Sequence, residues 1–336
     1  MKTLRLKDGK ADICRAAEIL KNGGIVAIPT ETVYGLAASA FDGDAIDKVF
    51  IAKGRPQDNP LIVHISDMEM LEDITCDVPS VLYTLAEKFW PGPLTLVLPC
   101  GDKVSKKVTA GLKTVAVRMP SSAVARDIIK ETGLPLAAPS ANISGSPSPT
   151  SAEHVLSDLD GKIDAVVMSE NSRVGVESTV VTLSTNPPRL LRPGGVTAEQ
   201  LKEFLPDLVL DSAVLAEPEK DKPVASPGMK YKHYSPKTKI LLVEAKSDDF
   251  ANFVNKEQNC GAICFSEDEK LLSVPHIVYG KADDDASQAA GLFEALRAAD
   301  TLSAEKVYVH APQKSGVGLA VYNRLIRAAG FEVIDL

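Results

Sequence analysis

The chain has 336 residues and a formal net charge of −8, and hydrophobic residues make up 45% of it and charged residues 24%. Its length exceeds the roughly 100 to 200 residues of one typical domain, so we expect two domains; the composition is typical of soluble globular proteins and excludes membrane spans and a basic nucleic-acid-binding arm. The five cysteines are odd in number and scattered, and the first residues lack the apolar core of a secretion signal, so we expect a reduced, cytoplasmic protein.

The first informative segment is Pro-Thr-Glu-Thr-Val-Tyr-Gly-Leu at residues 29–36, directly after an apolar strand expected at 25–28. Four hydrogen-bonding side chains gather at this strand end: Thr30, Glu31, Thr32 and Tyr34. Because α/β proteins bind ligands at strand ends, this cluster indicates a ligand site. The alternative is a capped strand-to-helix turn, since Thr and Glu also serve helix N-termini.

A basic loop follows at residues 53–61, where Lys53 and Arg55 flank a glycine and Asn59 precedes a proline. Two cations on a loop stiffened by prolines suit a phosphate group, because little entropy is lost in ordering them. The alternative is a solvated basic loop. His64, inside a strand expected at 61–65, is by itself more typical of a buried structural histidine than of a catalyst.

Arg118 ends an apolar strand expected at residues 115–118 and stands just before Met119-Pro120. A guanidinium fixed at a strand end suits a carboxylate or a phosphate. A salt bridge within the fold is an equally good interpretation of this residue.

Residues 136–150 combine an apolar lead-in with Ser, Asn, Gly, Pro and Thr, and they carry no charge. Small side chains let the backbone approach a ligand, and Ser and Asn give the directional hydrogen bonds that suit a nucleotide. The alternative is a flexible linker. Residues 175–181 and 190–195 repeat the pattern of a strand edge with a hydroxyl pair or an arginine, and either segment could be structural.

We expect a mixed α+β domain at residues 1–208, a linker rich in proline and charge at 209–237, and a smaller α/β domain with a parallel sheet at 238–336. In the first domain we expect helices at about 10–22, 43–53, 80–89 and 122–132, and strands at 25–28, 61–65, 94–98, 115–118, 166–168 and 179–183. In the last domain we expect strands at 239–243, 261–265, 276–279, 306–310 and 331–334, and helices at 248–256, 286–299 and 319–329.

Several common motifs are absent from the sequence. It contains no Gly-x-x-x-x-Gly-Lys-Ser/Thr, no Gly-x-Gly-x-x-Gly after a strand, no Gly-x-Ser-x-Gly and no His-Glu-x-x-His. We interpret residues 314–319 as a helix start with glycines, not a phosphate loop. Cys260 and Cys264 have metal-ligand spacing, but they lie in an apolar strand-like run and are interpreted as core residues.

The motifs form an ordered series: residues 29–36, Lys-Gly-Arg-Pro at 53–56 with Asn-Pro-Leu at 59–61, His64, Pro-Gly-Pro-Leu-Thr at 91–95, Arg-Met-Pro at 118–120, Ala-Pro-Ser-Ala-Asn-Ile-Ser-Gly at 138–145, Glu-Ser-Thr-Val at 177–180 and Arg-Pro-Gly at 192–194. This series resembles the YrdC-like family of L-threonylcarbamoyladenylate synthases. Residues 226–236, with Lys-Tyr-Lys-His-Tyr at their centre, are similar to the linker of the long two-domain form, so the resemblance covers essentially the whole chain. Thr182-Leu183 stands where the family often has Asp-Leu.

The resemblance implies a fold and a reaction. The fold would be α/β, with a twisted mixed α+β sheet of the YrdC-like type followed by a smaller Rossmann-like domain with a parallel sheet. The reaction would convert L-threonine, bicarbonate and ATP to L-threonylcarbamoyladenylate and pyrophosphate, for the threonylcarbamoyl modification of adenosine 37 in tRNA. Mg²⁺ is expected to bind through the triphosphate and not through a protein metal site. The partners implied are these small molecules and a downstream threonylcarbamoyl transferase, with weak or no direct tRNA binding and no membrane.

The resemblance also implies roles for individual residues. The catalytic residues would be Lys53 and Arg55. The L-threonine site would consist of Thr32, His64, Arg118, Ala138 through its backbone, and Ser178. The ATP site would consist of Lys53, Arg55, Asn59, Thr114, Ser140, Asn142, Ser148, Arg192 and Tyr231. Within residues 29–36, Thr32 would contact substrate, and Thr30, Glu31 and Tyr34 would shape the loop and the neighbouring nucleotide site. A further hypothesis comes from the density of ligand-type side chains at residues 230–234. We predict that residues 227–234 close over the nucleotide as a lid, with Tyr231 reaching the phosphates.

Two other functions compete with this interpretation. One is an RNA-binding module, because proteins with this N-terminal fold can carry a basic concave surface; the acidic balance along the chain argues against it. The other is a carbamoyltransferase-like enzyme that acts on a different amine. It shares the chemistry and differs only in the amine that it accepts.

Overall fold

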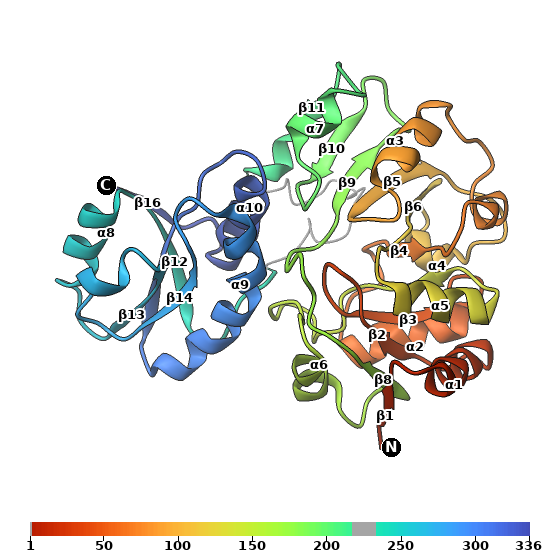
Figure 1. Cartoon of the computed structure of the whole chain (residues 1–336), viewed down its shortest axis with the longest axis horizontal. Helices are drawn as coiled ribbons and strands as arrows, with labels where there is room; N and C mark the ends of the chain where they lie inside the picture. The colour runs from red at the N-terminus through yellow and green to blue at the C-terminus, as the bar shows by residue number, and fades with distance from the viewer. Residues whose placement is uncertain (1, 217–232) are drawn as a thin grey trace.

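The computed structural model describes residues 2–216 and 233–336, which form two bodies, each built around its own sheet (Figure 1). The larger body contains an 11-stranded mixed sheet in the order β1-β8-β2-β3-β7-β4-β6-β5-β9-β10-β11. Its strands are β1 (Leu4–Lys7), β2 (Val26–Ile28), β3 (Gly35–Ser39), β4 (Ile62–His64), β5 (Leu94–Pro99), β6 (Thr114–Arg118), β7 (Leu136–Ala137), β8 (Ala165–Met168), β9 (Thr179–Thr182), β10 (Arg189–Arg192) and β11 (Val209–Leu210).

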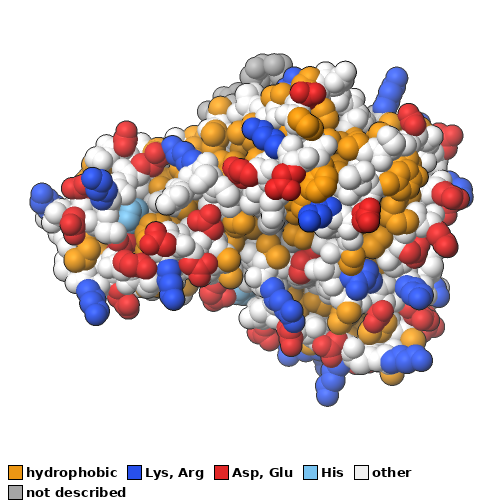
Figure 2. Space-filling model, turned by 45° about the horizontal axis from the view of Figure 1, so that its top comes forward, with side chains coloured by type: hydrophobic (Ala, Val, Ile, Leu, Met, Phe, Trp, Pro, Cys, Tyr) orange, Lys and Arg blue, Asp and Glu red, His pale blue; other side chains and the backbone are white. Residues whose placement is uncertain are grey.

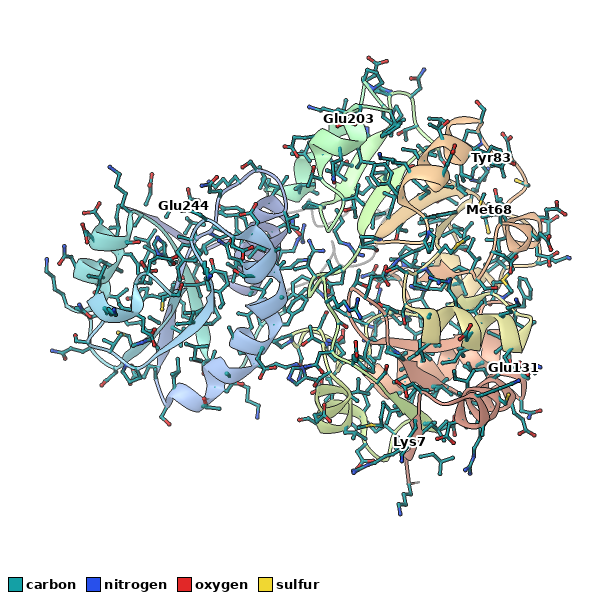
Figure 3. All side chains as sticks on the ribbon, in the orientation of Figure 1. Lys7, Met68, Tyr83, Glu131, Glu203 and Glu244 are labelled. Atoms are coloured by element: carbon teal, nitrogen blue, oxygen red, sulfur yellow. The ribbon has the colours of Figure 1, made fainter. Side chains whose placement is uncertain are left out.

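Helices cover both faces of this sheet. They are α1 (Lys10–Lys21), α2 (Gly43–Lys53), α3 (Val81–Phe89), α4 (Lys106–Thr109), α5 (Ala123–Thr132), α6 (Ala152–Leu159) and α7 (Ala198–Lys202). One core cluster packs α1 and α5 against β2, through residues such as Leu20, Ile128 and Val26. A second cluster packs α2, α3 and α6 against the opposite face. Figure 3 shows side chains filling the space between strands and helices in both bodies.

The smaller body is a five-stranded sheet in which all the pairs are parallel, in the order β14-β13-β15-β12-β16. Its strands are β12 (Lys239–Glu244), β13 (Cys260–Phe265), β14 (His276–Gly280), β15 (Lys306–His310) and β16 (Val333–Asp335), and its helices are α8 (Ser247–Val254), α9 (Asp285–Ala298) and α10 (Gly318–Ala328). The mixed sheet followed by a parallel sheet confirms the fold class that we predicted. No helix in the described part of the chain is long and apolar enough to cross a membrane.

Two smaller predictions for this body are also confirmed. Cys260 and Cys264 are both buried in β13, as expected of core residues. Residues 314–319 lead into α10, whose first residue, Gly318, donates its backbone N–H to Oδ2 of Asp285 at 3.0 Å. A carboxylate of the chain itself therefore binds this helix N-terminus.

The segment at residues 29–34 connects two antiparallel strands, β2 and β3, and does not lead into a helix. The capped strand-to-helix turn is therefore ruled out. Thr30 Oγ1 bonds the carbonyl of Val33 at 2.6 Å and lies 2.9 Å from Thr32 Oγ1, which closes the turn locally. The expectation that Thr30 shapes this loop is confirmed.

Candidate active site

A pocket lies in the larger body where several strand ends meet, and the chain just before the smaller body reaches it. β4 and β6 are parallel neighbours, and His64 pairs in register with Arg118, so both side chains stand at the carboxyl edge of the sheet. The predicted site residues that line the pocket are Thr32, Arg55, His64, Arg118, Ala138, Ser140, Asn142, Ser148, Ser178 and Arg192. Seven separate places in the sequence therefore converge on one cavity.

Arg118 is a fixed guanidinium on the wall of this pocket. Its Nε donates to the carbonyl of Gly92 at 3.1 Å, its Nη1 donates to Oγ1 of Thr32 at 2.8 Å, and its Nη2 lies 2.6 Å from Oε1 of Glu31. Burial alone would raise the pKa of Glu31, but Arg118 and a backbone N–H at Ser121 hold it below its usual value. Arg118 therefore both forms a salt bridge within the fold and lines the pocket, so the two interpretations of this residue do not exclude each other.

His64 is a neutral histidine beside this arginine. Burial, and then the charge of Arg118, lower its pKa to about 3. Its Nδ1 lies 3.3 Å from the carbonyl of Ile62. An uncharged ring adds no positive charge to the pocket and takes up no proton near pH 7.

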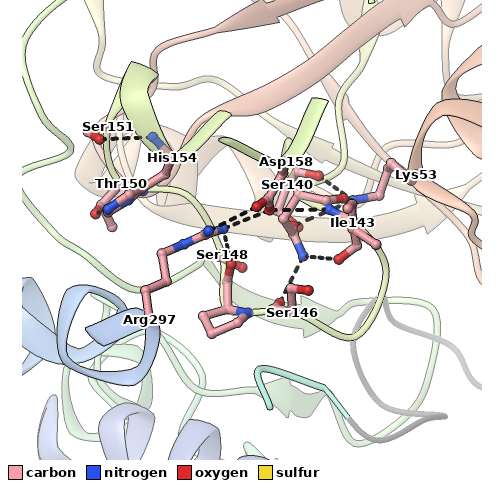
Figure 4. Close-up of polar contacts among 12 residues, drawn as sticks. Lys53, Ser140, Ile143, Ser146, Ser148, Thr150, Ser151, His154, Asp158 and Arg297 are labelled. Carbon is pink, nitrogen blue, oxygen red and sulfur yellow. Dashed lines mark hydrogen bonds and ion pairs between the residues drawn. The ribbon is translucent and has the colours of Figure 1, made fainter. Parts of the chain in front are cut away.

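Lys53 is fully buried and supports the loop that carries two other site residues. Its Nζ donates to the carbonyl of Ser140 at 2.5 Å (Figure 4) and to that of Asn142 at 2.7 Å. In addition, the N–H of Ser144 donates to the carbonyl of Lys53 at 2.8 Å. Burial, and then the charge of Arg55, lower its pKa well below the usual value. The amine thus faces loop carbonyls and does not line the pocket, unlike the direct ATP contact that we expected; its part in catalysis stays a prediction.

The other two cationic residues of the predicted ATP site do line the pocket. Arg55 Nη2 donates to the carbonyls of Asn59 and Pro60, both at 3.3 Å. Arg192 donates from Nε to the carbonyl of Ser178 at 3.1 Å and from Nη2 to Oγ of Ser178 at 3.2 Å. Burial, and then the charge of Arg324, lower the pKa of Arg192 to about 10, so it stays a cation at neutral pH.

Besides Lys53, three predicted site residues lie outside the pocket lining or outside the described residues. Asn59 is buried and does not line the pocket, and its carbonyl accepts from Arg55. Thr114 begins β6, at the opposite end of the strand from Arg118, and pairs with Pro99. Tyr231, together with most of the lid segment at 227–234, lies outside the described residues.

The site also contains residues for which sequence reasoning predicted no substrate contact, and four of these have charged or aromatic side chains. Glu177, His233 and Tyr234 line the pocket, and Arg324 of α10 contacts Glu177. Glu177 lies within residues 175–181, and His233 and Tyr234 lie within residues 227–234. Both segments were named in the sequence analysis, so these residues could have been assigned to the site. Arg324 had no such signal, because it appears as one polar residue in an amphipathic helix.

His233 and Tyr234 connect the pocket with the smaller body. Burial, and then the charge of Arg55, lower the pKa of His233 to about 3. The ring of Tyr234 packs on Phe293 of α9 with centroids 5.4 Å apart. The pocket therefore combines three arginines, neutral polar side chains and small backbone-exposing residues, which suits an anionic nucleotide beside a small zwitterion. Within the described residues, no group of three or more His, Cys, Asp and Glu side chains could hold a metal ion.

Comparison with protein families gives two matches that together span most of the chain. Residues 18–194 match the model described as telomere recombination, of the Sua5/YciO/YrdC type, and residues 196–330 match the model described as the C-terminal domain of threonylcarbamoyl-AMP synthase. The threonylcarbamoyl-AMP synthase of Bacillus subtilis is 44% identical over 99% of this chain and 97% of its own length. That of Pyrococcus abyssi is 41% identical, again over 99% of this chain and 97% of its own length.

A solved structure also matches this chain over its full length. The crystal structure of P. abyssi Sua5 complexed with L-threonine superimposes with a TM-score of 0.91 at 39% identity and covers 100% of both chains. The match therefore includes the smaller body as well as the larger one.

Proposed function

The chain belongs to the two-domain form of the threonylcarbamoyl-AMP synthase family and is an enzyme of that activity, and from this premise we propose how its pocket makes the adenylate. The substrates are L-threonine, ATP and, as we propose, bicarbonate. The observation that carries the proposal is the single pocket in which a set of residues suited to an amino acid adjoins a set suited to a nucleotide.

The threonine set lies around the ends of β4 and β6. Arg118 offers a fixed positive charge to the threonine carboxylate, and Thr32, held by Arg118, lies beside it. Neutral His64, the backbone at Ala138 and the hydroxyl of Ser178 surround the rest of the amino acid. L-Threonine, a zwitterion with its own hydroxyl group, would therefore contact one cation, Arg118, and several uncharged polar groups.

The ATP set lies toward the 140–148 loop. Arg55 and Arg192 would bind the phosphates as cations, with Ser140, Asn142 and Ser148 along the nucleotide. Lys53 and Asn59 support this wall from behind. The contacts predicted for Thr114 and Tyr231 stay predictions, because Thr114 lies at the far end of β6 and Tyr231 is not described.

In the reaction that we propose, the amine of threonine combines with bicarbonate to give a carbamate and water. A carbamate oxygen then attacks the α-phosphorus of ATP, the bond to the β-phosphate oxygen breaks, and pyrophosphate leaves. Mg²⁺ would accompany the phosphates and lower their charge. The side chains of the chain bind, orient and stabilise charge, and such positioning supplies roughly 7 to 11 kcal/mol of barrier reduction in well-aligned systems.

We propose that the product passes to a downstream threonylcarbamoyl transferase, because a mixed anhydride with AMP is an activated acyl donor. Direct tRNA binding is expected to be weak or absent. In support, Figure 2 shows lysine and arginine side chains interspersed with aspartate and glutamate on the face drawn, without a continuous basic stripe there. The cytoplasmic location predicted from the sequence stays a prediction.

The test measures pyrophosphate release with ATP, Mg²⁺, bicarbonate and each amino acid in turn. We expect release to depend on threonine, and Arg55→Ala to lower it by at least about tenfold, since an interaction with a charged group contributes roughly 1.5 to 3 kcal/mol. Arg15→Ala, on the exposed face of α1, is the matched control and should behave as wild type. Release driven equally well by another amine, or near-normal release by Arg55→Ala, would contradict the proposal.

A further inference from the structure

Arg324 is a fully buried arginine of the smaller body that forms an ion pair with a glutamate of the larger body. Its Nε donates to Oε2 of Glu177 at 2.8 Å, and its Nη1 donates to the carbonyl of Pro193 at 2.7 Å. The side chain of Arg324 has 0% of its surface exposed, and that of Glu177 has 9%. A buried charge is tolerated only when it is paired and hydrogen-bonded, so this contact fixes how α10 sits against the pocket.

α10 is itself held in place around this arginine. The neighbouring Asn323 accepts from Nη1 of Arg324 at 2.9 Å through its Oδ1, and its Nδ2 donates to the carbonyl of Val214 at 2.6 Å. The guanidinium is therefore oriented by residues of both bodies and cannot turn away from Glu177 without breaking these bonds.

The second carboxylate oxygen of Glu177 faces the pocket. Its Oε1 accepts a hydrogen bond from Oγ of Ser148 at 2.5 Å. Burial by itself would raise the pKa of Glu177, but Arg324, followed by Arg192, holds it below the usual value. An ionised carboxylate only accepts hydrogen bonds, so the hydroxyl hydrogen of Ser148 must point at Glu177.

The direction of this bond decides what Ser148 can bind. With its hydrogen on Glu177, the hydroxyl offers the pocket lone pairs only. Phosphate oxygens are acceptors as well, so they are poor partners for Ser148 in this state. The nucleoside part of ATP carries donors: the 2′ and 3′ hydroxyls of the ribose and the amino group of adenine.

We propose that Arg324 is a positioning residue that the smaller body contributes to the active site: through Glu177 it fixes Ser148 as a hydrogen-bond acceptor for a donor on the nucleoside of ATP. The inference rests on the proposed function for the presence of ATP in this pocket. It narrows the role of Ser148 from ATP contact in general to nucleoside recognition. It also gives the smaller body a part in the chemistry of the pocket.

Glu177→Gln tests the polarity of the bond with almost no change of shape. The amide oxygen would face Arg324, which only donates, so the amide N–H would turn to Ser148 and make the serine donate into the pocket. The measurement is the dissociation constant, without threonine, of ATP, 2′-deoxy-ATP, 3′-deoxy-ATP and inosine triphosphate. We expect wild type to bind one of the three analogues about tenfold more weakly than ATP, the effect of one lost hydrogen bond, and Glu177→Gln to lose that preference.

Arg324→Met and the double variant Arg324→Met/Glu177→Gln test the arginine itself. The single variant leaves a buried carboxylate without its ion-pair partner, so it should be less stable than wild type and bind ATP more weakly. The double variant removes both charges, so it should unfold at a higher temperature than the single variant. Its amide is no longer oriented by Arg324 and can turn its oxygen to Ser148, so it should keep more of the analogue preference than Glu177→Gln alone. Lys314→Met is the matched control, because Lys314 contacts Tyr322 of α10 and pairs with Glu244 away from the pocket.

The outcomes separate this inference from the proposed function. An analogue preference that Glu177→Gln retains in full, or a wild type that binds all three analogues as it binds ATP, would overturn the role of Arg324 and Ser148. A wild type without threonine-dependent pyrophosphate release would overturn the proposed function. The nucleotide dissociation constants are measured without threonine, so they would still test the role of Arg324 and Ser148.

Discussion

Each buried cation of the site faces an acceptor supplied by the protein. Arg118 pairs with Glu31, Arg324 pairs with Glu177, and Lys53 donates to the carbonyls of its loop. Because these contacts are made within the chain itself, they orient the groups that would face threonine and ATP. Such pre-organisation is what charge stabilisation in a transition state requires.

His64 gives a prediction for stability against pH. Its pKa is about 3 in the folded chain and about 6.5 in an unfolded one, so between these values only the unfolded state binds the proton. Stability should therefore fall as the pH is lowered below about 6.5. From pH 7 to pH 5 the free energy of unfolding of His64→Asn should fall by about 2 kcal/mol less than that of wild type.

Urea unfolding at both pH values measures this difference. Between pH 7 and pH 8 the gap between the two proteins should change by only about 0.1 kcal/mol, because the histidine is mostly neutral in both states there. His154 and His233 also have lowered pKa values, but they are present in both proteins and cancel. An identical loss in wild type and variant down to pH 5 would show that His64 is protonated within the fold.

At the scale of single residues, the sequence predicted which residues belong to the pocket better than it predicted where their side chains point. Thr32, Arg118 and Ser178 stand in short distinctive segments, and these segments do converge on the pocket. The orientation of Lys53 could not be predicted, because it depends on a loop almost ninety residues away, and the hydrogen bond to Asn142 spans a sequence separation of 89. The pair of Arg324 with Glu177 spans 147 positions and left no local signal at all.

Among the elements, strands with β-branched runs were predictable and strands of small residues were not. β4 and β6 lie within or close to the segments that we predicted. β3 was missed because Gly-Leu-Ala-Ala-Ser lacks the branched and aromatic residues typical of strands, and all five residues are buried by tertiary packing alone. α6 was missed because it follows a Ser- and Pro-rich segment; Ser151, at the end of that segment, caps it by accepting from the N–H of His154.

The contact between α6 and α9 gives a prediction at this scale. Arg297 of α9 forms a two-pronged ion pair with Asp158 of α6, at 3.0 and 2.9 Å, and donates to the carbonyl of Pro147 at 2.5 Å (Figure 4). Both side chains are mostly buried, at 15% and 11% exposed. Arg297→Met should lower the free energy of unfolding by about 1 to 3 kcal/mol.

A double-mutant cycle with Asp158→Asn measures the pair itself in urea unfolding. The matched control is Arg173→Met, whose partner Glu170 is as exposed as Arg173 itself, so its loss should be too small to detect. If the Arg297 and Arg173 variants lost the same stability, the contact between α6 and α9 would carry no energetic weight.

In the whole molecule, both bodies contribute to one site: the larger body forms the pocket, and the smaller body pairs Arg324 with the pocket residue Glu177. Figure 1 shows α9 and α10 on the side of the smaller body that faces the larger one. Gly175 lets α9 approach closely, since a Cβ there would lie 2.2 Å from the carbonyl oxygen of Ala289 and its φ is +77°. The parallel sheet of the smaller body was predictable from its alternating pattern. Its contribution to the pocket was not, because that depends on how the two bodies meet.

The central claim, that this pocket builds a threonylcarbamoyl adenylate, is tested most directly by following the carbon of bicarbonate. The protein is incubated with ATP, Mg²⁺, L-threonine and ¹³C-bicarbonate, and the nucleotide products are analysed by mass spectrometry. We predict a single new species, threonylcarbamoyl-AMP, that carries one ¹³C and appears together with pyrophosphate. An adenylate without the label, or pyrophosphate release that continues without threonine, would contradict the account.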